Sequence, residues 1–261
     1  MGDMCYRPLI EDMEFSYSRL KSFKDCPYRW YLQYIRNQPQ EPTFFASFGV
    51  FVHELIARKI QGEPTDRLAL EYLTGFRGRV RGPPPNTKVF NSYFQAGLEA
   101  IRRPLELPCK ALEVETRYHF QVEEMPIQGV VDLIGRSEDD AFVIVDHKSR
   151  ALKPRSGRKK PTKYDQELDE YLRQLYLYAI PIFEKYGELP SELVFNCYRS
   201  GDTIREPFTP EGFSDAKQWA LGTYHEILDA SDFPPDIEFF KCSYLCQQKS
   251  NCEYYQLNFE G

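Results

Sequence analysis

The sequence contains no apolar stretch long enough to cross a lipid bilayer, and its N-terminus lacks the basic and then apolar regions of a secretory signal. It contains no internal repeat and no G-x-x-x-x-G-K-[ST] phosphate-binding loop. It also lacks a C-x-x-C dithiol, the pattern typical of redox proteins. These absences predict a cytoplasmic protein that contacts no membrane and has no ATP-driven motor.

The sequence has no excess of positive charge. Its formal net charge is -6, which argues against a protein that coats nucleic acid but leaves room for a local basic groove. The 261 residues suffice for one large domain or two small ones, and 42% of them are hydrophobic, enough for a sizeable core. Aromatic residues are frequent, at 15%, and could serve that core or stack on bases.

Seven cysteines are present, and in a reducing compartment they are expected as metal ligands or buried thiols rather than disulfides. Cys242, Cys246 and Cys252 form a C-x3-C-x5-C pattern. Thiolates bind zinc or iron–sulfur clusters, and three of them require a fourth ligand from elsewhere. The alternative is a set of reduced, unliganded thiols. Cys5, Cys109 and Cys197 show no relation to this pattern.

Hydrophobic periodicity predicts an α/β fold. Ser16 is expected to cap a first helix, which Pro27 should divide into two short ones. Further helices are expected at 46–62, 64–78, 88–102, 164–186 and from Thr209 or Pro210 to about 230, and strands at 111–122, 126–136, 141–149, 191–199 and 202–207. The tail, 231–261, is expected to be loop-like. This order predicts a mixed central sheet flanked by helices, with a helical N-terminal region.

Charged residues interrupt two of the apolar strands. Asp132 lies within Val130–Ile134, and Asp146 ends the run Phe142–Val145. Lys148 follows two residues later, so it should share a strand face with Asp146. Two carboxylates can bind Mg2+ or Mn2+, and a nearby lysine can orient a water or offset charge on a phosphate. A buried Asp–Lys ion pair is the simpler alternative.

Three further residues extend this pattern. His53 lies on the amphipathic 46–62 helix and could bind a metal, although a lone helical histidine is more often structural. Gln174 and Tyr178 are spaced i, i+4 on the long helix, so they share a face, as ordinary surface residues also do.

In chain order, His53, Asp132, Asp146-x-Lys148 and Gln174-x-x-x-Tyr178 resemble the motifs of RecB-type nucleases in the PD-(D/E)XK superfamily. The opening segment SYSRLKSFKDCPYRWYLQYI is similar to the start of AddB-type and CRISPR-associated exonucleases. The resemblance implies a restriction-endonuclease-like fold in a single domain, 1–261. Its parts would be a helical region at 15–105, a nuclease core at 106–231 and a C-terminal iron–sulfur cluster segment at 232–261.

The resemblance also implies roles for these residues. His53, Asp132, Asp146 and the backbone carbonyl of His147 would bind Mg2+ or Mn2+. Asp132, Asp146 and Lys148 would be catalytic, with Lys148 orienting the attacking water, while Gln174 and Tyr178 would contact DNA. Glu115 is an additional candidate acid, in competition with Glu113. Cys26, Cys242, Cys246 and Cys252 would hold a [4Fe–4S] cluster, with zinc as the rival; the family usually has C-x2-C where this chain has C-x3-C.

Residues 150–163 carry seven Lys or Arg and no acid, directly after Lys148. Lys153, Arg155, Arg158, Lys159 and Lys160 are therefore expected to bind the phosphate backbone of DNA, unless the segment is only a solvated loop.

The sequence thus predicts a metal-dependent deoxyribonuclease, an exonuclease on single-stranded ends by analogy with the family. Without a motor it would need DNA that is already single-stranded, or a partner such as a helicase or CRISPR adaptation protein. The alternatives are a non-catalytic iron–sulfur DNA-binding subunit and a redox or zinc protein.

Overall fold

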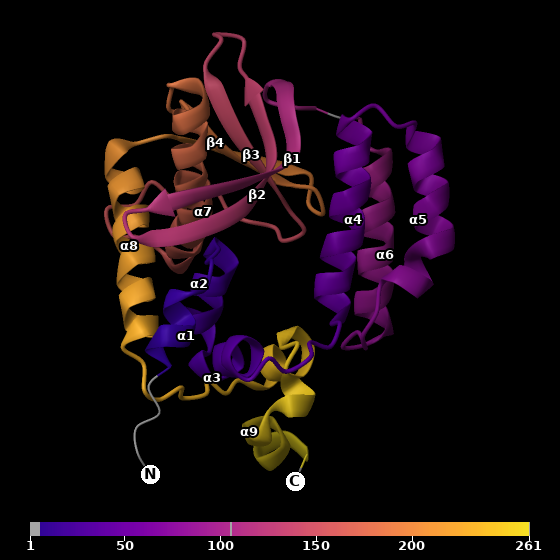
Figure 1. Cartoon of the computed structure of the whole chain (residues 1–261). Coiled ribbons are helices and arrows are strands. Elements are labelled where there is room, and N and C mark those ends of the chain that lie inside the picture. Colours follow the sequence, from indigo (N-terminus) through magenta and orange to yellow (C-terminus); the bar gives the residue numbers. More distant parts are fainter. Residues whose placement is uncertain (1–5, 105, 261) are drawn as a thin grey trace.

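A five-stranded mixed sheet forms the centre of the computed structural model, which describes residues 6–104 and 106–260 (Figure 1). Its strands, in spatial as well as chain order, are β1 (Lys110–Val122), β2 (Met125–Arg136), β3 (Phe142–Lys148), β4 (Glu192–Cys197) and β5 (Asp202–Pro207). Neighbours are antiparallel except β3 and β4, which are parallel and are joined by the crossover helix α7 (Lys163–Tyr186). The predicted mixed α/β sheet is confirmed.

Helices flank this sheet, and three further helices, α4 to α6, form a separate arm in the N-terminal part of the chain. The helices are α1 (Arg7–Glu11), α2 (Tyr17–Asp25), α3 (Pro27–Trp30), α4 (Phe44–Ile60), α5 (Thr65–Arg79), α6 (Thr87–Arg102), α7, α8 (Pro210–Leu228) and α9 (Glu253–Tyr255). Short π or 3-10 segments are η1 (Tyr31–Ile35), η2 (Lys241–Leu245), η3 (Lys249–Asn251) and η4 (Gln256–Glu260). None of the described helices is both long and apolar enough to cross a membrane.

The structure differs from the sequence-based expectation at both ends of the chain. Helix α1 was not predicted, and the prediction of a loop-like tail was wrong, because the tail contains the helical turns η2, η3, α9 and η4. Each of these segments has only three to five residues, which is too short for a helical periodicity to appear in the sequence.

Local capping signals positioned the starts of two helices correctly, α2 and α8. The Ser16 side chain accepts a hydrogen bond from the backbone N–H of Arg19 at 3.1 Å, which caps α2. Helix α2 ends at Asp25, and Pro27 begins α3, so the predicted break is confirmed. The Thr209 side chain caps α8 in the same manner.

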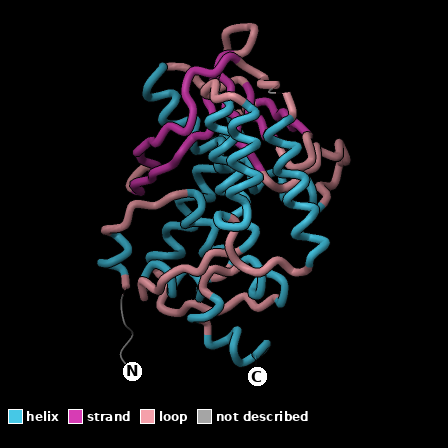
Figure 2. Tube along the Cα trace, turned by 90° about the vertical axis from the view of Figure 1, so that its right-hand side faces the viewer, coloured by secondary structure: helices cyan, strands magenta, loops and turns pink. Residues whose placement is uncertain are grey.

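The two faces of the sheet are covered differently. Helices α7, α8 and α2 contribute to a large apolar core on one face, which includes Leu175, Ile144 and Phe195. The small cluster around Val145 on the other face is joined by Ile60, at the end of α4. Helices α4, α5 and α6 stand side by side as the arm (Figure 2) and share their own core, to which α4 contributes the apolar face predicted from the sequence.

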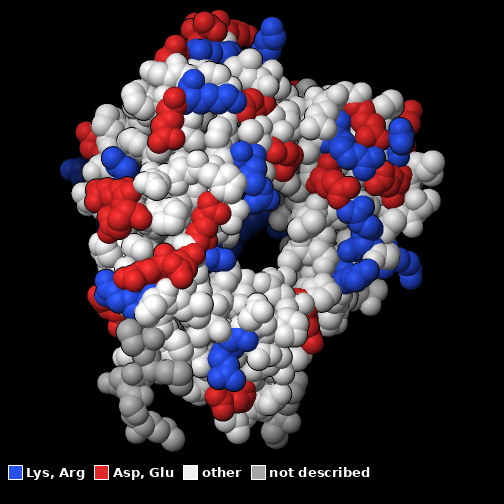
Figure 3. Space-filling view, in the orientation of Figure 1, with Lys and Arg blue, Asp and Glu red and all other residues white. Residues whose placement is uncertain are grey.

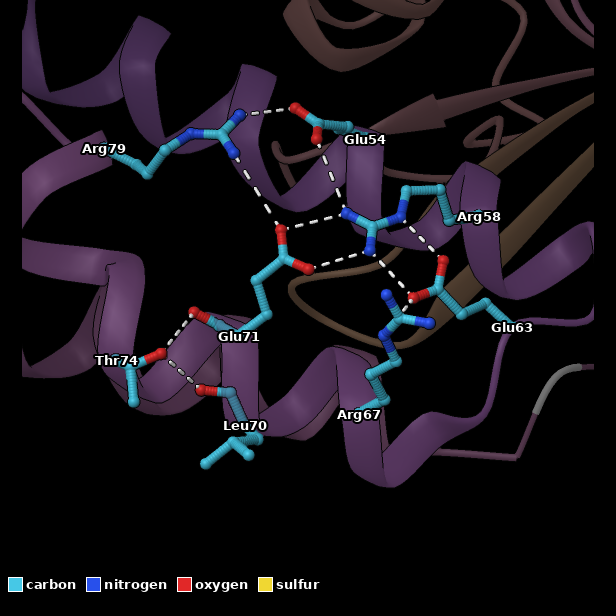
Figure 4. Close-up of polar contacts among 8 residues, drawn as sticks. All are labelled: Glu54, Arg58, Glu63, Arg67, Leu70, Glu71, Thr74 and Arg79. Atoms are coloured by element: carbon cyan, nitrogen blue, oxygen red, sulfur yellow. Dashed lines mark hydrogen bonds and ion pairs between the residues drawn. The ribbon is translucent and has the colours of Figure 1, made fainter.

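An ion-pair network ties α5 to α4 on the outside of the arm (Figure 4). The Arg58 guanidinium lies 2.8 Å from a carboxylate oxygen of Glu63 and 2.7 Å from one of Glu71. Arg79 forms an ion pair with Glu54, one turn before Arg58 on α4. These groups are partly exposed, so their contribution to stability is modest and depends on salt.

Candidate functional site

Three side chains from different elements converge at one edge of the sheet. His53 from α4 places Nε2 2.9 Å from Oδ2 of Asp132 on β2 and 3.6 Å from Oε1 of Glu115 on β1. One ligand atom from each residue lies within 4.8 Å of the other two, and buried Oε1 of Glu115 has no hydrogen-bond partner in the described structure. Two carboxylates and an imidazole this close together suit a hard divalent cation.

The backbone at Glu115 decides which of two candidate acids enters this site. Glu115 lies between the pairs Val114–Leu133 and Thr116–Val131 of the β1–β2 register and has a φ of +53°, in the left-handed region. Glu113 instead accepts hydrogen bonds from Lys185, Tyr186 and Tyr118. The two glutamates are two residues apart and would share a face in a regular strand. The turn of the backbone at Glu115 separates them.

Asp146 and Lys148 form the second part of the site, on β3. Both side chains lie on the face that packs against α7, and Nζ of Lys148 is 2.8 Å from Oδ2 of Asp146. The same ammonium donates a hydrogen bond of 3.1 Å to Oε1 of Gln174, whose amide donates to the Tyr178 hydroxyl at 3.0 Å. The structure therefore joins four of the predicted residues into one chain of contacts.

Burial and mutual charge shift the pKa values of these groups. Burial lowers the pKa of His53, but the neighbouring carboxylates outweigh it and raise the pKa to about 9. Burial raises the pKa of Asp146 to about 6, against the effect of the Lys148 ammonium. Burial acts in the same sense on Asp132, but the hydrogen bond with His53 outweighs it and lowers the pKa. Ionisable groups perturbed in this way are frequent at functional sites.

His147 occupies the position between Asp146 and Lys148 and faces the opposite side of β3. Its backbone N–H donates to Oδ2 of Asp132 at 2.7 Å, which fixes the orientation of that carboxylate. Its imidazole Nδ1 lies 3.1 Å from the side-chain amide of Asn196, its partner in the β3–β4 register. Burial lowers the pKa of this imidazole to about 4, so it is neutral at physiological pH.

Sequence reasoning overlooked Tyr171. The Lys148 ammonium lies 5.2 Å from the centre of the Tyr171 ring, a distance at which a cation and an aromatic face attract each other. Tyr171, Gln174 and Tyr178 are spaced i, i+3, i+7 on α7, so they follow one helix face. This i, i+3, i+7 spacing is the sequence signal from which Tyr171 could have been predicted as part of the site.

The basic segment that follows β3 is held to the protein at several points. Leu152 is buried, Arg155 pairs with Asp169 and Glu206, and Arg150 pairs with Glu167. Lys153, Arg158, Lys159 and Lys160 are exposed and have no ion pair within the described part of the chain. Part of the positive charge of this segment is thus neutralised locally.

The four cysteines predicted to act together line one pocket. Cys26 lies at the junction of α2 and α3, and Cys242, Cys246 and Cys252 come from the C-terminal segment. The backbone N–H of Asp236 donates to Sγ of Cys26 at 3.4 Å, and burial raises the pKa values of the Cys246 and Cys252 thiols. Cys109 and Cys197 lie elsewhere, with Cys197 buried in the core, and Cys5 lies outside the described residues.

The chain is similar to known proteins in sequence and in fold. A family model described as "PD-(D/E)XK nuclease superfamily" matches residues 14–253. The crystal structure of a "putative exonuclease" from Eubacterium rectale superposes with a TM-score of 0.56 at 10% sequence identity, covering 99% of this chain and 92% of that one, which shows a shared fold. The structure of a protein named SSO0001 covers 94% and 87% at 16% identity, with a TM-score of only 0.37. No curated protein sequence matches the chain.

Proposed function

Because the chain belongs to the PD-(D/E)XK nuclease superfamily, we propose that it is a divalent-metal-dependent deoxyribonuclease that degrades single-stranded DNA from its ends. The observation that carries this proposal is the convergence of His53, Glu115 and Asp132 beside the Asp146–Lys148 pair. The finer assignment to an exonuclease has support from the name of the Eubacterium rectale protein, whose fold is similar.

The residues present fit a divalent cation. His53, Glu115, Asp132 and Asp146 would hold Mg2+ or Mn2+, with the backbone carbonyl of His147 as a further ligand. The Oε1 atom of Glu115 supports this, since it is buried, accepts no hydrogen bond in the described structure and has its lone pairs free for a cation beside His53 and Asp132. A bound cation supplies charge neutralisation at the phosphate and lowers the pKa of water.

Lys148 would act on the attacking water and on the scissile phosphate. Asp146 and Gln174 hold its ammonium from two sides, and the Tyr171 ring lies beside it. An ammonium fixed in this manner can donate a hydrogen bond in a constant direction, which is the requirement for orienting a water or a phosphate oxygen. Gln174 and Tyr178 would contact the DNA next to it, and the exposed cations of the 150–163 segment would contact the strand farther away.

The four cysteines are proposed to hold a [4Fe–4S] cluster that fastens the C-terminal segment to α3. Its support is that thiols from both ends of the chain line one pocket, and thiolates are the ligands of iron–sulfur clusters. Zinc, which thiolates also bind, is the alternative, and elemental analysis distinguishes the two metals.

A nuclease of this kind would serve CRISPR adaptation, phage recombination or DNA repair. The sequence has no ATP-binding loop of the helicase type. The proposed substrate is therefore DNA that is already single-stranded, or DNA that a partner helicase or adaptation protein supplies.

End-labelled linear and closed circular single-stranded DNA, each with Mg2+ or Mn2+, test the proposal. The wild type should degrade the linear DNA alone, and Lys148→Ala should lower the rate by at least about 100-fold. Lys88→Ala, which removes an exposed lysine of α6, should retain the wild-type rate. Cleavage of both substrates would identify an endonuclease with the same centre. Binding without any cleavage would favour the non-catalytic DNA-binding subunit.

A further inference from the structure

A cavity of about 680 Å³ adjoins the catalytic lysine, between α2, α3, the β1–β2 hairpin and α7. Lys148, Gln174 and Tyr178 form one side of it. The opposite sides come from α2, from Arg29 on α3 and from Arg117 on β1. A molecule that fills this cavity therefore lies next to Lys148, and His53, Glu115 and Asp132 are not among the residues that line it.

The lining of this cavity is positive although the whole chain is acidic. It contains the four cations Lys21, Arg29, Arg117 and Lys148 and the single acid Asp25, whereas the chain has a net charge of -6. Figure 3 shows Lys and Arg side chains gathered along one side of a hollow in the middle of this face of the molecule. A concave surface with charge of one sign concentrates ligands of the opposite sign.

Two of these cations have bonding capacity to spare. Arg117 donates a hydrogen bond to the amide oxygen of Gln128 at 2.7 Å, and within the described structure it forms no ion pair. Arg29 lies 3.5 Å from Asp25, but its buried Nε–H has no acceptor in the described structure. Arg29 lines this cavity and also the cysteine pocket, so its side chain brings a second guanidinium with an unused donor to the cavity wall.

The other two cations are already engaged. Lys21 pairs with Asp25 and Glu170, and Lys148 pairs with Asp146. No residue of the basic 150–163 segment is among those that line the cavity. A DNA strand bound next to Lys148 would therefore contact Arg117 and Arg29 before it reaches the basic segment 150–163.

We propose that this cavity is a phosphate-binding subsite for one nucleic-acid strand, with Arg117 and Arg29 as its ligands, and that it directs the strand to Lys148. The inference rests on the proposed nuclease function and adds the residues that grip the substrate beside the point of cleavage. Guanidinium groups bind phosphate oxygens through paired N–H donors. The Tyr171 ring, which also lines the cavity, offers a face on which an unpaired base can stack.

Binding of a fluorescent single-stranded oligonucleotide to the full-length protein, without divalent ions and at several salt concentrations, tests this subsite. Arg117→Gln should weaken binding and reduce the slope of log affinity against log salt by about 0.7, the value for one lost phosphate contact on a single strand. Arg29→Gln should act in the same direction. Arg67→Gln, which removes one charge from an arginine side chain that is 74% exposed on α5, should leave affinity and slope unchanged.

Oligonucleotides with and without a 5′- or 3′-phosphate distinguish the two sources of that phosphate group. A loss of affinity in Arg117→Gln that requires a terminal phosphate assigns the subsite to the strand end. An equal loss with every oligonucleotide assigns it to an internal phosphodiester, and both results support the subsite.

Wild-type affinity and slope in Arg117→Gln and Arg29→Gln, in a preparation that cleaves DNA, would overturn the subsite and leave the proposed function standing. Absence of both binding and cleavage in the wild type would overturn the proposed function, and the subsite with it.

Discussion

Glu113 and Glu115 show how a single residue decides the composition of the site. Both glutamates follow the same alternation in the sequence, yet Glu115 faces His53 and Glu113 faces Lys185. The left-handed φ of Glu115 produces this difference. Such a conformation is uncommon for a residue other than glycine and is frequent at functional sites.

Removing the charge of Glu115 should weaken metal binding. Glu115→Gln is expected to lower the affinity for Mn2+ by about 10–100-fold, as the loss of a metal-site group typically does. Titration calorimetry with Mn2+ measures this directly. Glu113→Gln is the matched control, since it changes the same residue type on the same strand and should leave the affinity for Mn2+ unchanged. Equal losses in both variants would contradict the assignment of Glu115.

Glu113 should instead make stability depend on pH. Burial raises its pKa, but hydrogen bonds from Lys185, Tyr186 and Tyr118 outweigh this and lower the pKa to about 2. Glutamate in an unfolded chain has a pKa of about 4.3. The stabilisation is therefore complete above that value and is lost as the pH falls toward 2. Chemical unfolding from pH 6 downward should show the wild type losing stability more steeply than Glu113→Gln; parallel curves would argue against this role.

At the scale of elements, the helical arm positions His53 because its three helices pack closely. A Cβ added at Gly97 of α6 would lie 2.7 Å from Cζ of Tyr72 on α5 and 3.0 Å from the Phe48 ring on α4. Glycine at this position thus permits the approach of all three helices. The Arg58 network on the outside then ties α5 to the helix that carries His53 (Figure 4).

Substitution of this glycine should destabilise the arm. Gly97→Ala is expected to lower the free energy of unfolding by about 1–3 kcal/mol, because the added methyl group overpacks the contact with Tyr72. Gly78→Ala provides the control, since a Cβ there meets nothing within 4 Å. That change should raise stability by up to about 1 kcal/mol through the better helix propensity of alanine. Denaturant unfolding compares the two, and equal effects would contradict the packing argument.

At the scale of the whole molecule, the C-terminal segment closes the chain on its N-terminal region (Figure 1). The Tyr28 hydroxyl donates to Glu253 at 2.8 Å, and the Gln248 amide donates to the backbone carbonyl of Gln38 at 3.1 Å. Arg29 lines both the cysteine pocket and the cavity beside Lys148. The position of this arginine therefore couples the cysteine segment to the proposed phosphate subsite.

Loss of Cys26 should affect metal content, stability and DNA binding together. Cys26→Ala is expected to remove most of the bound iron, to lower the melting temperature and to weaken binding of single-stranded DNA, because the clip between α3 and the C-terminal segment opens. Elemental analysis for iron and zinc, thermal melting and oligonucleotide binding measure the three effects. Cys109→Ala removes a thiol outside the pocket and should retain wild-type metal content. Unchanged metal content and melting in Cys26→Ala would refute the proposed cluster.

The sequence by itself determined the strands, the longer helices and the superfamily. Strand and helix periods depend on residues a few positions apart, so the alternation around Asp146 and Lys148 and the apolar face around His53 were visible without coordinates. The caps at Ser16 and Thr209 are equally local. The membership of the PD-(D/E)XK superfamily, predicted from motifs in chain order, is confirmed by the family model.

Only the tertiary structure decided which charges are available and where they meet. In the folded protein, Arg155 forms ion pairs with acids from α7 and β5, whereas Arg117 has no ion pair within the described structure. Glu115 lies beside His53, and Glu113 pairs with Lys185 instead. The physical reason is that pairing and burial depend on residues far apart in the chain. A backbone angle such as φ at Glu115 is likewise set by the strands and helices packed around it, and no short-range pattern in the sequence records it.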